Sequence, residues 1–324
     1  MTPRWPPRGG RPGLPAPARL CARFCPVTLP PFPQDTPRAG ASVHLRFEDV
    51  TQDGRLVLEA LPNALGPTVW RGLLAHDPMP ALFFRQGIVP ILSRFMLEGA
   101  AGPLSANAPI DAQGTFRLSR ADDGRFMLDM WADLRGVIGR THGKTDRDGE
   151  RILAGRVLAE HVLTRPFAPA EQRRVTGLDF AGAPTDLPAR AASPPGDRIA
   201  ALPEGATPLE PQRAADRVPV VFGLVHTDSN LHVNSLVYLR VFEEAALRRF
   251  SALGRGSAVL GRALDIAYRK PCFAGQTMRV VQQAFEQEGR LGIAAVLVED
   301  REAQSPELLA RAKPHAYARI TFEA

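Results

Sequence analysis

His226-Thr227-Asp228-Ser229-Asn230-Leu231-His232-Val233-Asn234-Ser235 is the stretch that determines most of what this sequence predicts. It places a carboxylate at Asp228, a carboxamide at Asn230 and an imidazole at His232, on alternate residues. A helix is predicted directly after it, at about 235–253. The first N–H groups of a helix have no partner within it, so they can act together with side chains of the preceding loop.

The residues on both sides of this stretch predict an α+β unit. Asn234 or Ser235 suits the cap of the helix, and Gly254 and Gly256 suit its end. The helix carries an apolar stripe at helical spacing, formed by Tyr238, Leu239, Phe242, Ala245, Ala246 and Phe250. A strand is predicted before it in VPVVFGLV, and further strands are predicted after it at about 260–273, 276–287, 291–300 and 311–323.

The preceding part of the chain has a similar order of elements. Residues 44–61 alternate around Asp53-Gly54, which predicts two strands joined by a tight turn. A helix is predicted at about 80–99, starting at Pro80 and kinked at Pro90. Strands are then predicted in TFRLSR (115–120), RFMLDMWADLRG (125–136) and RILAGRVLAEHVL (151–163). The periodicity therefore favours an α+β chain with two similar halves.

Composition divides the chain into four segments. Residues 1–40 contain eleven prolines and almost no apolar periodicity, so they are predicted to be a disordered tail. Residues 41–165 form the first half. Residues 166–217, rich in Pro and Ala, are expected to be a linker or long crossover, and residues 218–324 form the second half.

Charge and composition argue against several classes of partner. The tail holds six Arg and one Asp, a formal +5 of the total +6, so the other 284 residues are nearly neutral. No basic stripe alternates with aromatics, and no nucleic-acid partner is expected. No window has the roughly 18 uninterrupted apolar residues that span a bilayer, so we expect no membrane partner and a cytoplasmic location. The three cysteines support neither a disulfide framework nor a zinc site.

The motif Asp228-x-Asn230-x-His232-Val233-Asn234 resembles the D-x-N-x-H-V-N-N signature of plant and bacterial acyl-ACP thioesterases. It is also similar to the shorter D-x-x-x-H-V-N motif of 4-hydroxybenzoyl-CoA-type thioesterases. The resemblance continues through Tyr238 and Phe242-Glu243-Glu244-Ala245, and it resumes in the segment 264–275, LDIAYRKPCFAG. It covers roughly residues 218–323, whereas the first half matches only in the order of its elements.

This resemblance implies a double hotdog, in which two bent antiparallel sheets each wrap a central helix. It implies an enzyme of lipid or polyketide metabolism that hydrolyses an acyl thioester of coenzyme A or acyl carrier protein. No cofactor or metal is implied, because CoA or phosphopantetheine enters only as part of the substrate. An acyl carrier protein is an expected partner, and a homodimer of double hotdogs is left open.

Thioester hydrolysis needs a base or a nucleophile, and donors aimed at the oxyanion. Asp228 can serve as nucleophile or base, and His232 can shuttle the proton or orient the water. Asn230 can donate to the thioester oxygen or hold Asp228, and helix N–H groups can complete the oxyanion site. Taken singly, Asp and Asn before a helix are ordinary turn and capping residues, so this interpretation depends on the whole motif.

Four other residues are weaker candidates. Glu243 and Glu244 lie on the predicted helix, where at least one is expected on the solvated surface. Cys272 falls where some plant-type thioesterases carry a cysteine once assigned as nucleophile, but Pro271 stands here in place of their glutamate. A lone cysteine on a buried strand is usually a core residue. His76 precedes the predicted first-half helix and is faintly similar to the H-F-P-x-x-P loop of hotdog dehydratases, although a loop histidine is the simpler interpretation.

Two alternative functions stay open at this point. A dehydratase or acyltransferase acting on carrier-bound intermediates would be favoured if His76 took part across the boundary between the halves. A non-catalytic module that binds acyl thioesters is the other. In the thioesterase interpretation the first half helps to wall the acyl channel, with Trp70, Phe83, Phe84, Ile88, Phe95, Met96 and Trp131.

Overall fold

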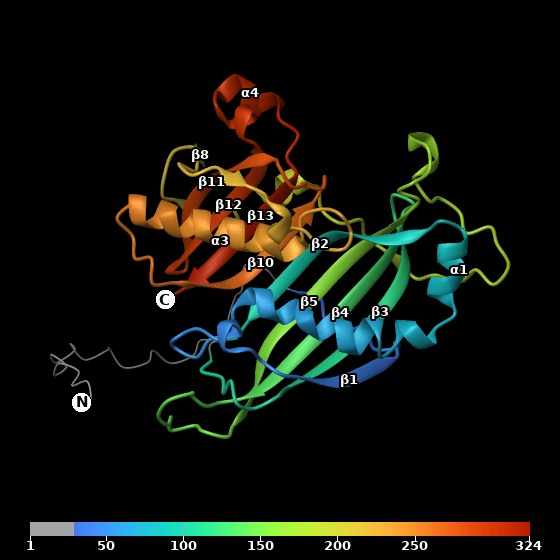
Figure 1. The fold of residues 1–324 in the computed structure, drawn as a ribbon, viewed down its shortest axis with the longest axis horizontal. Coiled ribbons are helices and arrows are strands. Elements are labelled where there is room, and N and C mark those ends of the chain that lie inside the picture. The colour runs from blue at the N-terminus through green and yellow to red at the C-terminus, as the bar shows by residue number, and fades with distance from the viewer. Residues whose placement is uncertain (1–28, 101) are drawn as a thin grey trace.

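The computed structural model describes residues 29–100 and 102–324 (Figure 1). Its strands form one sheet in the order β1-β3-β4-β5-β2-β10-β13-β12-β11-β7, with β6 paired to β3 and both β8 and β9 paired to β11. The strands are β1 (Arg38–Val43), β2 (Val89–Gly99), β3 (Ile110–Ala121), β4 (Phe126–Val137), β5 (Arg151–Thr164), β6 (Ala189–Arg190), β7 (Thr207–Pro208), β8 (Ala214–Ala215), β9 (Val220–Val221), β10 (Leu260–Tyr268), β11 (Thr277–Gln287), β12 (Arg290–Glu299) and β13 (Ala316–Glu323).

Two helical elements lie on one face of this sheet, one over each half of the chain (Figure 1). The helices are η1 (Phe47–Asp49), η2 (Leu58–Ala64), η3 (Gly66–Trp70), η4 (Leu74–His76), α1 (Met79–Arg85), η5 (Ala170–Gln172), α2 (Gly196–Ile199), η6 (Leu224–His226), α3 (Ser235–Ala252), η7 (Asp300–Ala303) and α4 (Pro306–Arg311). We call β1 to β5 with their helices the first half, and β9 to β13 with α3 the second half. The predicted α+β class is confirmed.

The second half follows its sequence pattern closely. The side chain of Asn234 caps α3, because its Oδ1 accepts from the N–H of Leu236 at 2.9 Å. Phe242 and Phe250 are fully buried against the sheet, as the apolar stripe predicts. The strand predicted at 311–323 is shorter than expected, because α4 and a connecting loop occupy its first residues. Of the strand predicted in VPVVFGLV, only the two residues of β9 are extended and paired.

The central helix of the first half begins inside the second strand that the sequence pattern predicted, at residues 55–61. Residues 58–76 form the short helices η2, η3 and η4, so the two strands predicted at 44–61 are wrong. The turn predicted at Asp53-Gly54 is present, and a bridge between Val50 and Leu56 closes it. Pro62 and the Gly66-Pro67 pair lie within this stretch, which is divided into 3-10 and π-helical pieces. Proline has no N–H to donate and therefore interrupts the hydrogen bonds of a continuous α-helix. Buried apolar residues nevertheless recur at helical spacing along it: Leu58, Leu61, Leu65 and Val69.

The helix predicted at 80–99 is also wrong, because α1 ends at Arg85 and the rest of the segment is β2. β2 pairs with β5 on one side and β10 on the other. Phe95, Met96 and Leu97 are all buried, since both faces of the sheet are covered there, and the strand therefore shows no alternation. Pro90 is tolerated because it lies outside the stretch of β2 that pairs with β10.

Buried charges join the two halves on the outer face of the sheet, opposite the central helices. Arg94 of β2 donates to both oxygens of Asp265 of β10, each at 2.7 Å, and reaches Glu160 of β5 at 3.4 Å. Arg190 from the crossover binds Glu160 at 3.0 Å and also binds Asp129. Burial raises the pKa of Asp129 to about 6. Asp129, Glu160 and Asp265 thus each have a guanidinium partner, as burial of charge requires.

Segments of low regularity cover other parts of the outer face. Leu29 and Phe32 pack on Met96, Trp131, Leu158 and Ala263. The prediction of disorder is therefore wrong for residues 29–40, since Leu29 is buried and β1 begins at Arg38. The remainder of the predicted tail, residues 1–28, lies outside the described residues.

The predicted linker at 166–217 crosses the outer face and adds short strands to the sheet. β6 pairs with β3 of the first half, and both β7 and β8 pair with the β11 edge of the second half. α2 packs against β13 and β10. In the described part of the chain, none of the helices has the length and apolar character needed to cross a membrane.

Candidate active site

The motif residues lie in a tight loop directly ahead of α3, which we call the motif loop (residues 227–234). A bridge between Thr227 and Val233 closes it. The N–H of Asp228 donates to the carbonyl of His232 at 3.1 Å, and that of Leu231 donates to the carbonyl of Asp228 at 3.0 Å. Leu231 has a φ of 65°, the left-handed region that a tight reversal requires. Asp228 and His232 are thus brought together at the base of one turn.

Two donors fix the carboxylate of Asp228. Its Oδ1 accepts from the main-chain N–H of Asn230 at 2.8 Å, and its Oδ2 accepts from Nδ2 of Asn234 at 3.0 Å. Asn234 therefore binds Asp228 with one end of its amide and caps α3 with the other. The sequence interpretation gave Asn234 only the capping role, although its place in the quoted motif was a signal for more.

His232 is half-buried, and its Nδ1 lies 3.1 Å from the carbonyl oxygen of Val233. A carbonyl can only accept, so this contact favours the tautomer that carries a proton on Nδ1, in which Nε2 is an acceptor. That is the state a general base needs. Asn230 is exposed, and its side chain forms no hydrogen bond with a described residue, so its carboxamide is open to a ligand.

The start of α3 supplies an available donor beside the motif loop. The N–H of Leu236 is taken by the Asn234 side chain, and that of Val237 by the Asn234 carbonyl at 3.0 Å. The N–H of Ser235 has no acceptor within the part of the chain that the structure describes. An unpaired N–H at a helix start is suited to a carbonyl oxygen that gains negative charge.

Cys272 contacts the motif loop through its main chain. Its carbonyl accepts from the N–H of Val233 at 2.8 Å, and its own N–H donates to the Tyr238 hydroxyl at 2.8 Å. The thiol is fully buried, 3.3 Å from Nδ1 of His315, and burial raises its pKa to about 11. A neutral thiol without solvent access is a poor nucleophile, so the geometry favours a core role.

Aromatic rings link the start of α3 to the first half. Phe95 of β2 packs edge-to-face on Tyr268 with ring centroids 6.3 Å apart, and Tyr268 packs on Tyr238 at 5.4 Å. The Tyr268 hydroxyl also donates to the carbonyl of Ser235 at 3.0 Å. The position of the motif loop is therefore tied to the seam between β2 and β10.

The motif loop has a counterpart in the first half, at residues 50–57 ahead of η2. A bridge between Val50 and Leu56 closes that loop, as the bridge between Thr227 and Val233 closes the motif loop. The N–H of Thr51 donates to the carbonyl of Arg55 at 2.8 Å, and Gly54 turns the chain with a φ of 89°. The two loops therefore share one backbone design.

Their side chains differ. When the two bridges are aligned, Thr51 occupies the position equivalent to Asp228, Asp53 that of Asn230 and Arg55 that of His232. The guanidinium of Arg55 is held by Asp53 at 2.7 Å and by the carbonyl of Glu323 at 3.0 Å. The first-half loop thus has no imidazole, and its one carboxylate is paired.

The weaker candidates are not gathered at the motif loop. His76 is exposed at the end of the first-half helical run, so it is not the structural counterpart of His232. Glu244 is exposed near Arg248. The carboxyl of Glu243 is buried against Gly261 and Leu58 at the junction of the halves, and burial, with Glu59 nearby, raises its pKa to about 8.

An apolar cavity of about 180 Å³ lies in the first half, at the end of the sheet where β2 begins. Its walls include Trp70, Phe83, Phe84, Ile88, Val89 and Pro90. Four of the predicted channel residues therefore line this cavity. Met96 and Trp131 do not, because they point to the outer face beneath Leu29. Phe95 packs in the shared core instead.

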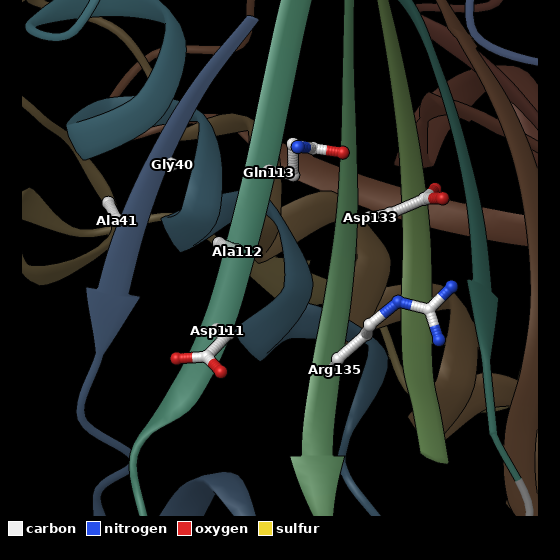
Figure 2. A pocket seen from close by; sticks show the side chains of 7 residues that line it. All are labelled: Gly40, Ala41, Asp111, Ala112, Gln113, Asp133 and Arg135. Carbon is white, nitrogen blue, oxygen red and sulfur yellow. The ribbon is translucent and has the colours of Figure 1, made fainter. Parts of the chain in front are cut away.

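A larger hollow of about 420 Å³ lies across β1, β3 and β4 (Figure 2). Asp111, Gln113, Asp133 and Arg135 project along this surface, away from the central helices, and none belongs to the motif. Asp111 of β3 and Asp133 of β4 form ion pairs with Arg151 and Arg156 of β5. This hollow is therefore a solvated face of the sheet. Among the described residues there is also no cluster of three side chains that could ligate a metal.

Comparison with known proteins finds similar solved structures. No protein-family model and no curated protein matches the chain. A Lactobacillus plantarum protein described as an oleoyl thioesterase superposes with a TM-score of 0.56 at 13% identity, over 90% of this chain and 98% of its own.

Two other thioesterase structures are similar over almost their whole length. An acyl-ACP thioesterase from Bacteroides thetaiotaomicron gives a TM-score of 0.51 at 15% identity, over 88% of this chain and 98% of its own. The 12:0-ACP thioesterase of Umbellularia californica gives 0.50 at 11% identity, over 88% and 97%. The chain therefore has the hotdog fold, as the resemblance of its motif predicted. β2 and β10 join the two predicted sheets into one.

Proposed function

We propose that this chain hydrolyses an acyl thioester of coenzyme A or acyl carrier protein, with the motif loop as its active site. The observation that carries the proposal is the placement of a doubly anchored carboxylate and an imidazole with an open Nε2 on one turn beside a free helix N–H. The fold shared with three thioesterases supports the substrate class.

In the proposed reaction, the oxygen of a water molecule attacks the thioester carbonyl carbon. Asp228 or Nε2 of His232 takes a proton from that water. The N–H of Ser235 and the carboxamide of Asn230 donate to the oxyanion. The C–S bond then breaks, and the proton passes to the leaving sulfur, which gives a carboxylic acid and a free thiol. Direct attack by Asp228, followed by hydrolysis of the mixed anhydride, is the variant of this scheme.

The acyl chain is proposed to enter the apolar cavity of the first half. β2 supplies the connection, since Val89 and Pro90 line the cavity while later residues of the same strand pair with β10. Trp70 and Phe83 contribute apolar walls. The first half then selects the acyl chain and the second half carries out the chemistry. A cytoplasmic location stays part of the proposal.

The alternatives gain no specific support. Participation of His76 across the boundary between the halves would favour a dehydratase or acyltransferase, but this residue is exposed at the end of η4. A binding module would show affinity for acyl thioesters without turnover.

The test is release of free thiol from a panel of acyl-CoA and acyl-ACP substrates of different chain length. The proposal expects catalytic turnover on at least one of them. Binding without thiol release would instead identify a binding module. Activity that requires His76 would favour the dehydratase or acyltransferase.

A further inference from the structure

Exposed apolar side chains gather around the motif loop. Leu224, Val225 and Leu231 are 81%, 87% and 83% exposed, and Val221 and Phe273 are 61% and 47% exposed. These five are among only thirteen large apolar side chains that are exposed in the described residues. Their concentration in two loops sets this part of the surface apart, because scattered single apolar residues are the usual pattern.

Hydrogen bonds hold these two loops together. The N–H of Phe222 donates to the carbonyl of Gln276 at 3.0 Å, and that of Gly275 donates back to Phe222 at 2.7 Å. The bond from Val233 to Cys272 joins the motif loop to the same segment. Val221, Leu224, Val225, Leu231 and Phe273 therefore form one region, which we call the apolar rim.

Basic side chains without partners flank the apolar rim. Arg269 and Lys270 precede Phe273 by a few residues, and the N–H groups of both donate to the carbonyl of His315. Lys313 lies two residues before His315, and Arg217 precedes β9. All four side chains are exposed, and none forms an ion pair with a described residue. We call Arg217, Arg269, Lys270 and Lys313 the basic flank.

We propose that the apolar rim and the basic flank dock this end of the molecule on an anionic membrane surface. Lasting peripheral attachment needs two contributions, apolar insertion and attraction of cations to anionic headgroups, and both are present here. A protein partner is disfavoured by composition, since Leu and Val are under-represented among the residues that dominate protein interfaces. Four of the five rim residues are Leu or Val.

This inference does not depend on the proposed thioesterase activity, and it departs from the expectation of no membrane partner. The test is cosedimentation of the full chain with vesicles of phosphatidylcholine, alone or mixed with phosphatidylglycerol. The wild-type chain is expected to bind the anionic vesicles and to lose most of that binding at high salt. The triple variant Leu224→Ser, Val225→Ser, Leu231→Asn should bind roughly tenfold more weakly or worse. Asparagine tolerates the left-handed backbone at position 231, so the loop is preserved.

Two matched variants test whether vesicle binding depends on the apolar rim and the basic flank or on any exposed apolar or basic side chain. Phe167→Ser removes an apolar side chain that is 95% exposed outside the rim, and Lys144→Glu reverses an exposed lysine outside the basic flank. Both should bind as the wild type does. The double variant Arg269→Glu, Lys270→Glu should bind anionic vesicles about thirtyfold more weakly or worse, because two cations near the surface are removed at about 1 kcal/mol each and two carboxylates are added. Thermal unfolding of each variant shows whether it is folded.

Three results would overturn the proposal. The first is that the wild type does not bind vesicles. The second is that the folded triple variant and the folded double variant both bind as the wild type does. The third is that Phe167→Ser loses as much binding as the triple variant. Binding of an acidic acyl carrier protein in place of vesicles, lost in the triple variant, would show that the rim is a protein interface and that the membrane proposal is wrong.

Discussion

Asn234 is the residue whose role the structure changes most, because its side chain connects the helix cap with Asp228. Asn234→Ser keeps a short oxygen for the cap and removes the donor to the carboxylate. We expect kcat to fall about tenfold or more, the worth of one hydrogen bond to a charged group, with little change in KM. The melting temperature should stay near that of the wild type.

Steady-state kinetics and thermal unfolding on the same preparation check this prediction. Ser235→Ala is the matched control, since it changes the neighbouring side chain and leaves both hydrogen bonds of Asn234 intact. Equal kinetic losses in the two variants would contradict a positioning role for Asn234.

Glu243 gives a pH-dependent prediction. Its pKa is raised to about 8 by burial, so the folded chain binds the proton more tightly than the unfolded chain. This favours the folded state at low pH, and the contribution is lost as pH rises from the ordinary carboxyl range toward about 8. Glu243→Gln, which cannot ionise, should unfold a few degrees higher than the wild type at about pH 9 and show less advantage at about pH 5.

Thermal unfolding across this pH range, with Glu244→Gln as the control, checks the prediction. Glu244 is exposed, so its replacement should have little effect at either pH. A stabilisation of Glu243→Gln that is the same at both ends of the range would show that the carboxyl is not buried as described.

At the residue scale, the sequence predicts which residues form the candidate site better than it predicts the hydrogen bonds between them. The catalytic interpretation of Asp228, Asn230 and His232 rests on the resemblance of the whole motif to that of acyl thioesterases. The structure places all three on one turn, and their catalytic roles stay a prediction. Spacing could not show that the carboxamide that holds Asp228 is that of Asn234. That contact depends on the left-handed backbone at Leu231, a conformation that a leucine seldom adopts.

At the element scale, the Arg94–Asp265 pair is expected to stabilise the junction of β2 and β10. Asp265 is 2% exposed and accepts twice from Arg94. Arg94→Ala would leave this carboxylate buried without its main partner, so we expect a loss of about 3–5 kcal/mol in the free energy of unfolding.

Arg240→Ala is the matched control for that measurement. Arg240 forms a similar two-bond pair with Glu59, but its side chain is 67% exposed, so its loss should cost less than about 1 kcal/mol. Denaturant unfolding compares the two variants. Similar losses would mean that burial does not distinguish the pairs.

Sequence patterns failed for the two first-half elements that tertiary context controls. β2 lies at the centre of the sheet, where burial on both faces removes the alternation that identifies a strand. Leu56, Leu58 and Ala60 alternate across the start of the helical run at 58–76, a pattern typical of a strand, and only the later spacing of Leu61, Leu65 and Val69 indicates a helix. α3 has a cap, a stripe and a terminal glycine, and it was predicted almost to the residue.

At the scale of the whole molecule, the N-terminal segment can be divided by its burial. Deleting residues 1–43 should lower the melting temperature by several degrees, because it removes β1 and the apolar contacts of Leu29 and Phe32. Deleting only residues 1–28 is expected to change it little, since that sequence lacks apolar content. Equal effects of the two deletions would contradict the packing of residues 29–43.

The motif loop and the first-half loop at 50–57 share one backbone design, but only the motif loop has an imidazole and an unpaired carboxylate. We therefore expect one active site per chain. His232→Ala is expected to lower kcat/KM at least a hundredfold, whereas His76→Ala should cost less than tenfold. Kinetics on the best substrate of the panel decide this. Equal losses would place His76 in the site and favour the dehydratase or acyltransferase.

The central claim is that the carboxylate of Asp228 drives thioester hydrolysis. The most direct measurement is the rate of free thiol release by Asp228→Asn, with Asp53→Asn in the first-half loop as the matched control. The account predicts that kcat falls by about two orders of magnitude or more in Asp228→Asn, with an unchanged melting temperature, and stays close to the wild-type value in the control. Undiminished turnover by a folded Asp228→Asn would contradict it.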